Sequence, residues 1–304
     1  MIMNGLLIID KPASMTSHDV VSRVRRVLKT KRVGHTGTLD PFATGVLVVL
    51  VGKATRLAQF LDKDEKEYEA VVRFGFETDT GDVTGVRSAE CGMQNDEIAA
   101  LLSSTDWNNL FDEFRGEVLQ TPPMYSAKKV KGKKLYELAR QGIEIQRQAV
   151  SVKVSELEVL NPPGFRIRNS ALRIRVVCSA GTYIRTLAED IGRKLGTGAH
   201  LVELRRTRAG RFDISESVTL EQLEASENPI EALRPMEEAV LHLPKIILRN
   251  DRVEKTRSGM STRFDANGLA DGQPMRMLDE NENLISVGMF RESEKAVQPK
   301  VVLV

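Results

Sequence analysis

The sequence contains only two cysteines in 304 residues, Cys91 and Cys178. Two thiols are too few for a disulfide framework, and no closed zinc site can be built on them. Long apolar stretches are missing as well, because no segment approaches the run of about 18 apolar residues that a membrane-spanning helix requires. We therefore expect a cytoplasmic protein with both thiols free and no contact with a membrane.

Three sequence signatures of cofactor chemistry are also missing. The chain has no Walker phosphate loop, no cluster of His and Cys with metal-ligand spacing and no dinucleotide-binding fingerprint. Residues 34–45 include a Gly-x-x-Gly spacing, but these glycines do not follow a strand and open a helix, so a phosphate cradle is the weaker interpretation. These absences fit a reaction that needs neither a cofactor nor a metal ion.

Positive charge is nearly balanced by negative charge, with 44 lysines and arginines against 42 aspartates and glutamates. The net charge of +2 does not point to a polyanionic ligand, but the distribution of the charge does. The basic residues gather in three clusters: Arg23, Arg25, Arg26, Lys29, Lys31 and Arg32; Lys128, Lys129, Lys131, Lys133 and Lys134; and Arg205, Arg206, Arg208 and Arg211. One such cluster alone is typical of a solvated surface, whereas three together predict a face that binds a polyanion.

Hydrophobic residues make up 41% of the chain, which is enough for a sizeable core in one large domain or two. Alternation and apolar runs predict strands at 5–9, 46–51, 68–74, 150–159 and 170–178. Helical periodicity predicts helices at 17–29, 54–61, 96–103, 133–141 and 183–195. Long strands with helices between them predict a mixed α/β domain.

The composition changes after Phe212. Residues 218–240 are acidic with a helical pattern that Pro229 and Pro235 interrupt. Short strands then follow from Leu243 onward, separated by Gly, Asn and Asp, at 245–248, 274–278, 284–289 and 300–304. We therefore expect two domains, at 1–240 and 241–304, the second small and rich in β structure.

Residues 34–45, Gly-His-Thr-Gly-Thr-Leu-Asp-Pro-Phe-Ala-Thr-Gly, are the most informative segment. Their glycines and threonines predict a loop. The loop holds a single carboxylate, Asp40, and Pro41 pushes this residue toward an extended backbone. Turn chemistry alone would favour a structural aspartate that bonds its own backbone. A lone acid on a rigid loop beside the buried strand at 46–51 also suits a reactive group.

This segment resembles the catalytic motif of the TruB family of tRNA pseudouridine-55 synthases. Further blocks resemble the family's motifs in the same order along the chain: residues 10–17 with Asp10-Lys11-Pro12, Lys66-x-Tyr68, residues 121–128, residues 178–187 and residues 198–206. The resemblance implies an α/β (α+β) catalytic domain with a mixed, largely antiparallel sheet and flanking helices. It also implies an RNA-binding insertion around 120–145 and a PUA-like RNA-binding domain at 241–304.

The resemblance implies isomerisation of uridine 55 in the T-arm loop of tRNA. The base would leave ribose C1′ through N1, turn and reattach through C5, after flipping out of its stack. Asp40 would either attack C1′ or remove a ribose proton, and the sequence leaves both routes open. Glycoside hydrolases usually need a second carboxylate, and its absence from this motif favours a reaction that keeps the base.

Two more residues receive catalytic roles from the resemblance. Arg185 would keep Asp40 ionised in a dry pocket, although its plain interpretation is a surface residue of a helix. Tyr68 would lie against the flipped base and take the C5 proton, although a tyrosine on a strand is also an ordinary core aromatic.

The remaining site residues would bind the substrate or support the pocket. His35 would fill the space that the flipped base leaves, although a loop histidine alone is more often a surface residue. Leu204 would form an apolar wall, although a leucine is usually just core. Lys11 and Pro12 would support the pocket, although an ordinary turn is the alternative. Tyr183 would pack against the site or contact the RNA. The expected phosphate contacts are Lys128, Lys129 and Lys131.

The expected partner is tRNA, through its T-arm stem-loop, with no obligate protein partner and a monomeric enzyme. Two alternatives remain open from the sequence. One is an RNA-guided relative that works within a protein–RNA particle. The other is a non-catalytic module that binds and folds tRNA with an idle acid.

Overall fold

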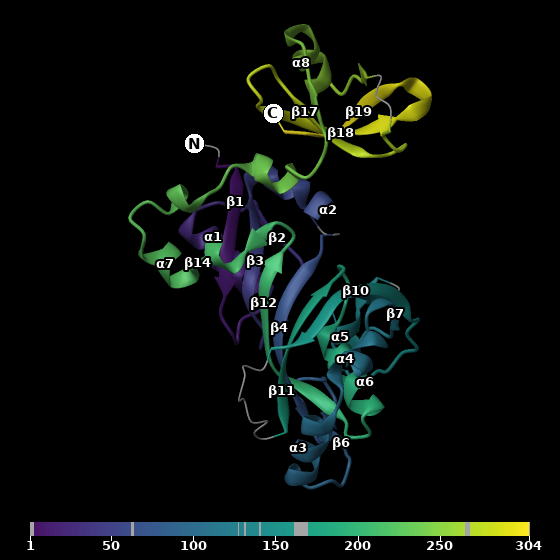
Figure 1. Ribbon diagram of the computed structural model, residues 1–304. Helices are drawn as coiled ribbons and strands as arrows, with labels where there is room; N and C mark the ends of the chain where they lie inside the picture. Colours follow the sequence, from purple (N-terminus) through teal and green to yellow (C-terminus); the bar gives the residue numbers. More distant parts are fainter. Residues whose placement is uncertain are drawn as a thin grey trace.

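The computed structural model describes residues 3–61, 64–126, 128–130, 132–139, 141–160, 170–264 and 268–303. In this part of the chain, ten strands form one large sheet with the path β14-β1-β3-β12-β4-β11-β10-β7, while β2 pairs with β3 and β13 with β12 (Figure 1). The strands are β1 (Gly5–Lys11), β2 (Val33–Thr36), β3 (Thr44–Val51), β4 (Lys66–Phe74), β7 (Gly116–Gln120), β10 (Val150–Val159), β11 (Ala171–Cys178), β12 (Ala199–Ala209), β13 (Phe212–Asp213) and β14 (Val218–Thr219). The β1–β14 and β3–β12 pairs are parallel and the other pairs of this sheet are antiparallel.

Helices flank this sheet, which confirms the expected fold class. They are α1 (Ser17–Val27), α2 (Ala58–Leu61), α3 (Asn95–Ser104), α4 (Trp107–Asp112), α5 (Leu135–Ala139), α6 (Ile184–Lys194) and α7 (Leu220–Ala225), with 3-10 turns η1 (Gly52–Leu57), η2 (Ile214–Glu216), η3 (Pro229–Ala232) and η4 (Met236–Val240). Two short hairpins join β5 (Phe76–Thr78) to β6 (Arg87–Glu90) and β8 (Lys129–Val130) to β9 (Lys133–Lys134). Within the described residues, no helix has both the length and the apolar character needed to cross a membrane.

The apolar run of β3 is buried along its length because the two faces of this strand lie in different cores. Val46, Val48 and Leu50 pack on the side of η1 and α2. Leu47 and Val49, with Val51, pack on the side of α1. Strand β4 shows the expected alternation, with Tyr68 and every second residue to Phe74 buried. The central strands β3, β12 and β4 therefore form a rigid base next to residues 37–43, which connect β2 to β3 and form the Asp40 loop.

Helix α1 begins where the sequence predicts it and ends two residues early. Thr16 caps its first turn: its hydroxyl accepts from the backbone N of Asp19, whose carboxylate accepts from the backbone N of Thr16. The helix ends at Val27 rather than at residue 29, and Lys29 has a positive φ of 49°. A left-handed residue ends a helix, so periodicity alone overestimated its length.

Three local expectations were wrong, and one strand was not foreseen. Residues 34–36 belong to β2 rather than to a loop, because their backbone pairs with β3 from Val33↔Val51 to Thr36↔Val48. Residues 199–209 form the eleven-residue strand β12, which the arginine pattern did not suggest. The first part of the helix expected at 54–61 is a 3-10 turn. The helix expected at 133–141 is shortened to α5 because β9 takes its first two residues.

The C-terminal strands form a second sheet in the order β15-β17-β18-β19-β16. They are β15 (Lys245–Ile247), β16 (Thr262–Arg263), β17 (Pro274–Leu278), β18 (Leu284–Arg291) and β19 (Ala296–Val302), accompanied by α8 (Asn250–Arg257) and the turn η5 (Glu292–Glu294). Helix α8 was not predicted. Leu278 and Val301 of this sheet pack in the same core as Leu6 of β1, and Arg56 donates a hydrogen bond to the carbonyl of Val302 (Figure 1). The division of the chain at residue 240 stays a prediction.

Candidate active site

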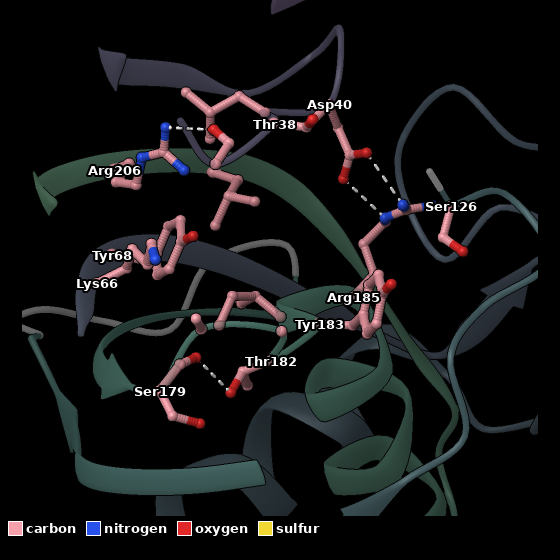
Figure 2. A pocket seen from close by; sticks show the side chains of 16 residues that line it. Thr38, Asp40, Lys66, Tyr68, Ser126, Ser179, Thr182, Tyr183, Arg185 and Arg206 are labelled. Atoms are coloured by element: carbon pink, nitrogen blue, oxygen red, sulfur yellow. Dashed lines mark hydrogen bonds and ion pairs between the residues drawn. The ribbon is translucent and has the colours of Figure 1, made fainter. Parts of the chain in front are cut away.

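A pocket of about 240 Å³ opens between the Asp40 loop, the strands β4 and β12, and the start of α6 (Figure 2). It is lined by Gly37, Thr38, Leu39, Asp40, Lys66, Tyr68, Ser126, Ser179, Ala180, Gly181, Thr182, Tyr183, Ile184, Arg185, Leu204 and Arg206. Five residues that the sequence predicts for the site lie in this lining, although they come from four separate segments: Asp40, Tyr68, Tyr183 with Arg185, and Leu204.

Asp40 and Arg185 form a two-pronged ion pair at one side of the pocket. The Nε of Arg185 lies 2.9 Å from Asp40 Oδ2, and its Nη2 donates to Asp40 Oδ1 at 3.0 Å (Figure 2). The Arg185 side chain is 5% exposed and that of Asp40 is 32% exposed. Arg185 is therefore not the surface residue of its plain interpretation, and the carboxylate is the partner that a ligand can reach.

The rest of the Arg185 guanidinium is held by backbone and by a second acid. Nη1 donates to the carbonyl of Thr80 at 2.8 Å, and Nη2 also donates to the carbonyl of Tyr125 at 2.7 Å. Asp82 Oδ2 lies 3.8 Å from Nη1, and this carboxylate is 4% exposed. Because each donor has an acceptor, Arg185 has one well-defined orientation, with its fork toward Asp40.

Burial raises the pKa of Asp40, and the neighbouring charge of Asp82 raises it further. Arg185 opposes both effects by its charge and by its hydrogen bonds, and Lys11 opposes them more weakly. The pKa of Asp40 is thus raised overall above its ordinary value, and one dedicated cation, Arg185, holds the carboxyl group in position in a desolvated place.

Lys11 lies behind the loop rather than in the pocket. It is fully buried, and its Nζ donates to the carbonyls of Pro12 at 2.8 Å, Met15 at 2.7 Å and Pro41 at 3.2 Å. Burial lowers the pKa of Lys11 to about 8. The ammonium group therefore joins the segment at 12–15 to the residue that follows Asp40, and Pro12 contributes a backbone acceptor to this joint.

Tyr68, Leu204 and Arg206 form the opposite side of the pocket. Tyr68 pairs across the sheet with Arg206, and Ala70 pairs with Leu204. Directly paired residues present their side chains on the same face, so the register of β4 and β12 brings these groups together. Burial raises the pKa of the Tyr68 hydroxyl, and the charge of Arg206 and its hydrogen bond to Tyr68 lower it in part.

The third basic cluster is divided between the interior and the surface, and binding of a polyanion by its surface arginines stays a prediction. Arg206 is 1% exposed, because alternation along β12 turns it toward the interior. Its three neighbours in the cluster are paired with carboxylates of the chain: Arg205 with Asp10, Arg208 with Glu67 and Arg211 with Glu238.

The other predicted binding residues lie outside the lining. His35 is half-buried in β2 and pairs with Val49. Lys128 is half-buried at the start of the segment 128–139. The side chain of Lys129 and the whole of Lys131 lie outside the described residues.

Sequence reasoning missed the contributions of Asp82, Thr80 and Arg206. The segment at 79–85, Asp-Thr-Gly-Asp-Val-Thr-Gly, carries a clear turn signal, but nothing in its pattern indicates that it lies against Arg185. Arg206 was assigned to the surface because it stands among other arginines in the sequence. In the described part of the chain, no group of three or more His, Cys, Asp or Glu side chains is arranged to hold a metal ion.

Comparison with known proteins identifies the family. Residues 25–184 match the N-terminal domain model of the TruB family pseudouridylate synthases, and residues 185–241 match the C-terminal domain model of tRNA pseudouridylate synthase B. The chain belongs to the TruB family. A tRNA pseudouridine synthase B of Heliobacterium modesticaldum is 43% identical over 99% of this chain and 95% of its own. A tRNA pseudouridine synthase B of Geobacillus thermodenitrificans is 45% identical over 87% of both chains.

A solved structure gives the same result for the fold. A chain of a Cbf5–Nop10–Gar1 complex matches with a TM-score of 0.74 and 29% identity, covering 100% of this TruB family member and 86% of the solved chain. The similarity extends over both sheets of the protein, including the residues after 241 that the two family models leave out.

Proposed function

We propose that this protein is a tRNA pseudouridine synthase that isomerises uridine 55 in the T-arm loop without a cofactor. The observation that carries the proposal is the pairing of Asp40 with Arg185 in a pocket whose other side is Tyr68 and Leu204. The names of the relatives in Heliobacterium and Geobacillus support the reaction and the RNA class.

The reaction moves ribose C1′ from N1 of uracil to C5 and moves one proton from C5 to N1. Because atoms and electrons balance within the nucleoside, the site needs groups that break one bond, hold the free base and pass one proton. One reactive carboxylate is enough for the first step, either as a nucleophile at C1′ or as a base toward a ribose proton. Asp82 does not supply a second reactive acid, because Arg185, Thr80 and Thr84 occupy its oxygens.

Arg185 supports Asp40 in two ways. Its charge favours the ionised carboxylate that either route requires, and its fork fixes both carboxylate oxygens relative to the pocket. Tyr68 faces the base and takes the C5 proton at the end, after C5 has bonded to ribose C1′, and Leu204 gives the base an apolar surface. His35, at the edge of the sheet beside the loop, fills the gap that the flipped nucleotide leaves in the RNA.

Binding of the RNA involves two further parts of the chain. The lysines at 128, 129 and 131 contact phosphates at the insertion around 120–145, and the C-terminal sheet at 241–304 acts as a PUA-like RNA-binding domain. Lys11, Pro12 and Tyr183 support the pocket. The protein works as a monomer in the cytoplasm.

The alternative function is that of an RNA-guided pseudouridine synthase within a protein–RNA particle. The solved structure supports this alternative, because its matching chain is part of a complex with Nop10 and Gar1. Identity favours the stand-alone enzyme, since it is 43% to the Heliobacterium tRNA pseudouridine synthase B and 29% to the chain of the complex. Turnover of a T-arm hairpin by the purified chain alone separates the two.

The decisive test is tritium release from a T-arm transcript labelled at C5 of uridine. We expect release by the unmodified chain and a loss of at least about 10⁴-fold in Asp40→Asn, because an amide is neither a nucleophile nor a base. RNA binding should stay nearly intact. Asp112→Asn is the matched control, since Asp112 is 69% exposed and pairs with Arg115 away from the pocket. Retained turnover in Asp40→Asn would remove Asp40 from the mechanism.

A further inference from the structure

Arg206 is a fully buried charged side chain with no role in the mechanism described so far. It is 1% exposed and lies on β12, between β3 and β4. Within the described residues no ion pair joins it to a carboxylate, although a buried charge is strongly unfavourable unless its donors are satisfied. The hydrogen bonds of Arg206 therefore indicate its role.

Two nitrogens of Arg206 are fixed by backbone carbonyls at the two ends of the Asp40 loop. Nη2 donates to Gly37 at 2.9 Å, and Nε donates to Val46 at 2.7 Å. Gly37 precedes Asp40 by three residues, and Val46 lies in β3 just after the loop. The fit at Gly37 is close, because a Cβ there would lie 3.3 Å from Nη1 and the φ of 66° favours glycine. The guanidinium is thus a bridge across the base of the loop.

The same guanidinium faces Tyr68. Arg206 and Tyr68 are direct partners across β12 and β4, and both line the pocket. In Figure 2 the guanidinium lies between the loop of Thr38 and Asp40 and the ring of Tyr68. The charge of the Arg206 guanidinium and its polar interaction with the Tyr68 hydroxyl lower the pKa of that hydroxyl in part. Because a guanidinium only donates, the phenol oxygen is the acceptor in any hydrogen bond between the two side chains.

We propose that Arg206 is a positioning residue for Tyr68: anchored on the Asp40 loop, it fixes the phenol oxygen so that its free lone pair faces C5 of the base once C5 has bonded to ribose C1′. The loop and the tyrosine then keep one spacing, and the carboxylate and the proton acceptor act on the same nucleotide. This inference rests on the proposed function, since its test measures uridine isomerisation.

A double-mutant cycle with an isotope-labelled substrate tests it. Single-turnover rates are measured for Arg206→Lys, Tyr68→Phe and the double variant, on T-arm transcripts with protium or deuterium at uridine C5. Loss of a charge-assisted hydrogen bond should slow Arg206→Lys by about 10- to 100-fold. The C5 deuterium isotope effect should rise, because proton removal becomes slower than bond cleavage. In the Tyr68→Phe background the same substitution should have little further effect.

Two comparisons separate positioning from a general loss of structure. Arg175→Lys is the matched control, because Arg175 lies on the neighbouring strand β11, holds Glu67, Glu156 and Glu158, and alternates to the opposite face from the pocket. It should leave the isotope effect unchanged. Arg206→Gln, which keeps an amide donor without the charge, is the second variant if Arg206→Lys does not fold.

Additive losses in the cycle, or an unchanged isotope effect in the folded Arg206 variants, would overturn this role. That outcome differs from a failure of the proposed function. If the unmodified chain turns over the transcript and Asp40→Asn does not, the proposed function is supported, whether or not the losses in the Arg206–Tyr68 double-mutant cycle are additive.

Discussion

The two sides of the pocket are built on different principles. The acidic wall, formed by Asp40, Arg185 and Asp82, consists of charges that hold one another. The tyrosine wall, formed by Tyr68, Leu204 and Arg206, consists of side chains placed by the register of two adjacent strands. In the acidic wall a change of one charge alters the other two residues. In the tyrosine wall a change acts on cross-strand partners and, through Arg206, on two carbonyls at the base of the Asp40 loop.

The two walls therefore differ in what determines the geometry of their side chains. The three residues of the acidic wall come from distant segments, and their mutual attraction and the carbonyls of Thr80 and Tyr125 hold them in one arrangement. The backbone hydrogen bonds of β4 and β12 fix the tyrosine wall independently of charge. We therefore expect substitutions in the acidic wall to change the rate of bond cleavage and its pH dependence, and substitutions in the tyrosine wall to change the proton step.

Arg185→Lys should break the acidic wall most severely among the variants that keep its charge. A single ammonium group cannot donate to both oxygens of Asp40 and also to two carbonyls, so the carboxylate loses its fixed orientation. We expect single-turnover rates to fall by about 100- to 1,000-fold while RNA binding changes little.

Arg193→Lys is the matched control for this prediction. Arg193 lies two turns further along α6 and makes a similar fork to Glu77, at 2.8 and 3.0 Å, but its side chain is 55% exposed. Its replacement should leave the rate within about two-fold, as exposed pairs contribute little. Equal rates for Arg185→Lys and the unmodified chain would show that charge alone suffices.

Asp82→Asn should have a smaller effect that sharpens the comparison. The substitution removes the like charge that raises the pKa of Asp40, so the acid limb of the pH–rate profile should move to lower pH. It also weakens the hold on Arg185, and we expect a rate loss of about 10-fold at neutral pH.

The control is Asp79→Asn in the same loop, where the carboxylate accepts from the backbone N of Val86 and does not contact Arg185. It should leave the acid limb in place. A shift of the limb in Asp79→Asn, or none in Asp82→Asn, would contradict the electrostatic role of Asp82.

The same division explains what the sequence could predict. Alternation along residues 68–74 placed Tyr68 on a buried face, and the apolar run at 46–51 identified the central strand. Asp40 stood out as a lone acid on a glycine-rich loop. Strand β12 was missed because its arginines suggest a solvated surface, whereas Arg206 is buried and the other two are paired with acids that lie elsewhere in the sequence.

Asp82 shows which part of the site cannot be predicted from local sequence patterns. Its local pattern predicts a turn, and the turn forms, with Thr80 and Thr84 bonded to the carboxylate. What no local pattern encodes is the contact with a helix that begins about 100 residues later. Long-range electrostatic contacts of this kind depend on the assembled sheet, so residue types and spacing cannot supply them.

Glu189 gives the smallest expected effect and tests the cost of ionising a buried acid on the helix that carries Arg185. It lies one turn after Arg185 on α6, its side chain is 18% exposed, and burial raises its pKa to about 7. Because the folded-state pKa lies above the ordinary value of 4.5, ionisation of Glu189 destabilises the fold as the pH rises from about 4.5 to 7. Glu189→Gln removes this cost. We expect the variant to be more stable by about 1–3 kcal/mol at pH 8 and nearly equal to the unmodified chain at pH 4.5, as measured by urea unfolding.

The control for Glu189 is Glu113→Gln, in which an exposed glutamate loses its ion pair to Lys194 of the same helix. Such a surface pair contributes little, so this variant should stay within about 1 kcal/mol at both pH values. A gain in Glu189→Gln that is the same at pH 8 and pH 4.5 would trace the effect to packing instead of charge. A gain confined to high pH would trace the loss of stability to ionisation of Glu189 in its buried position on α6.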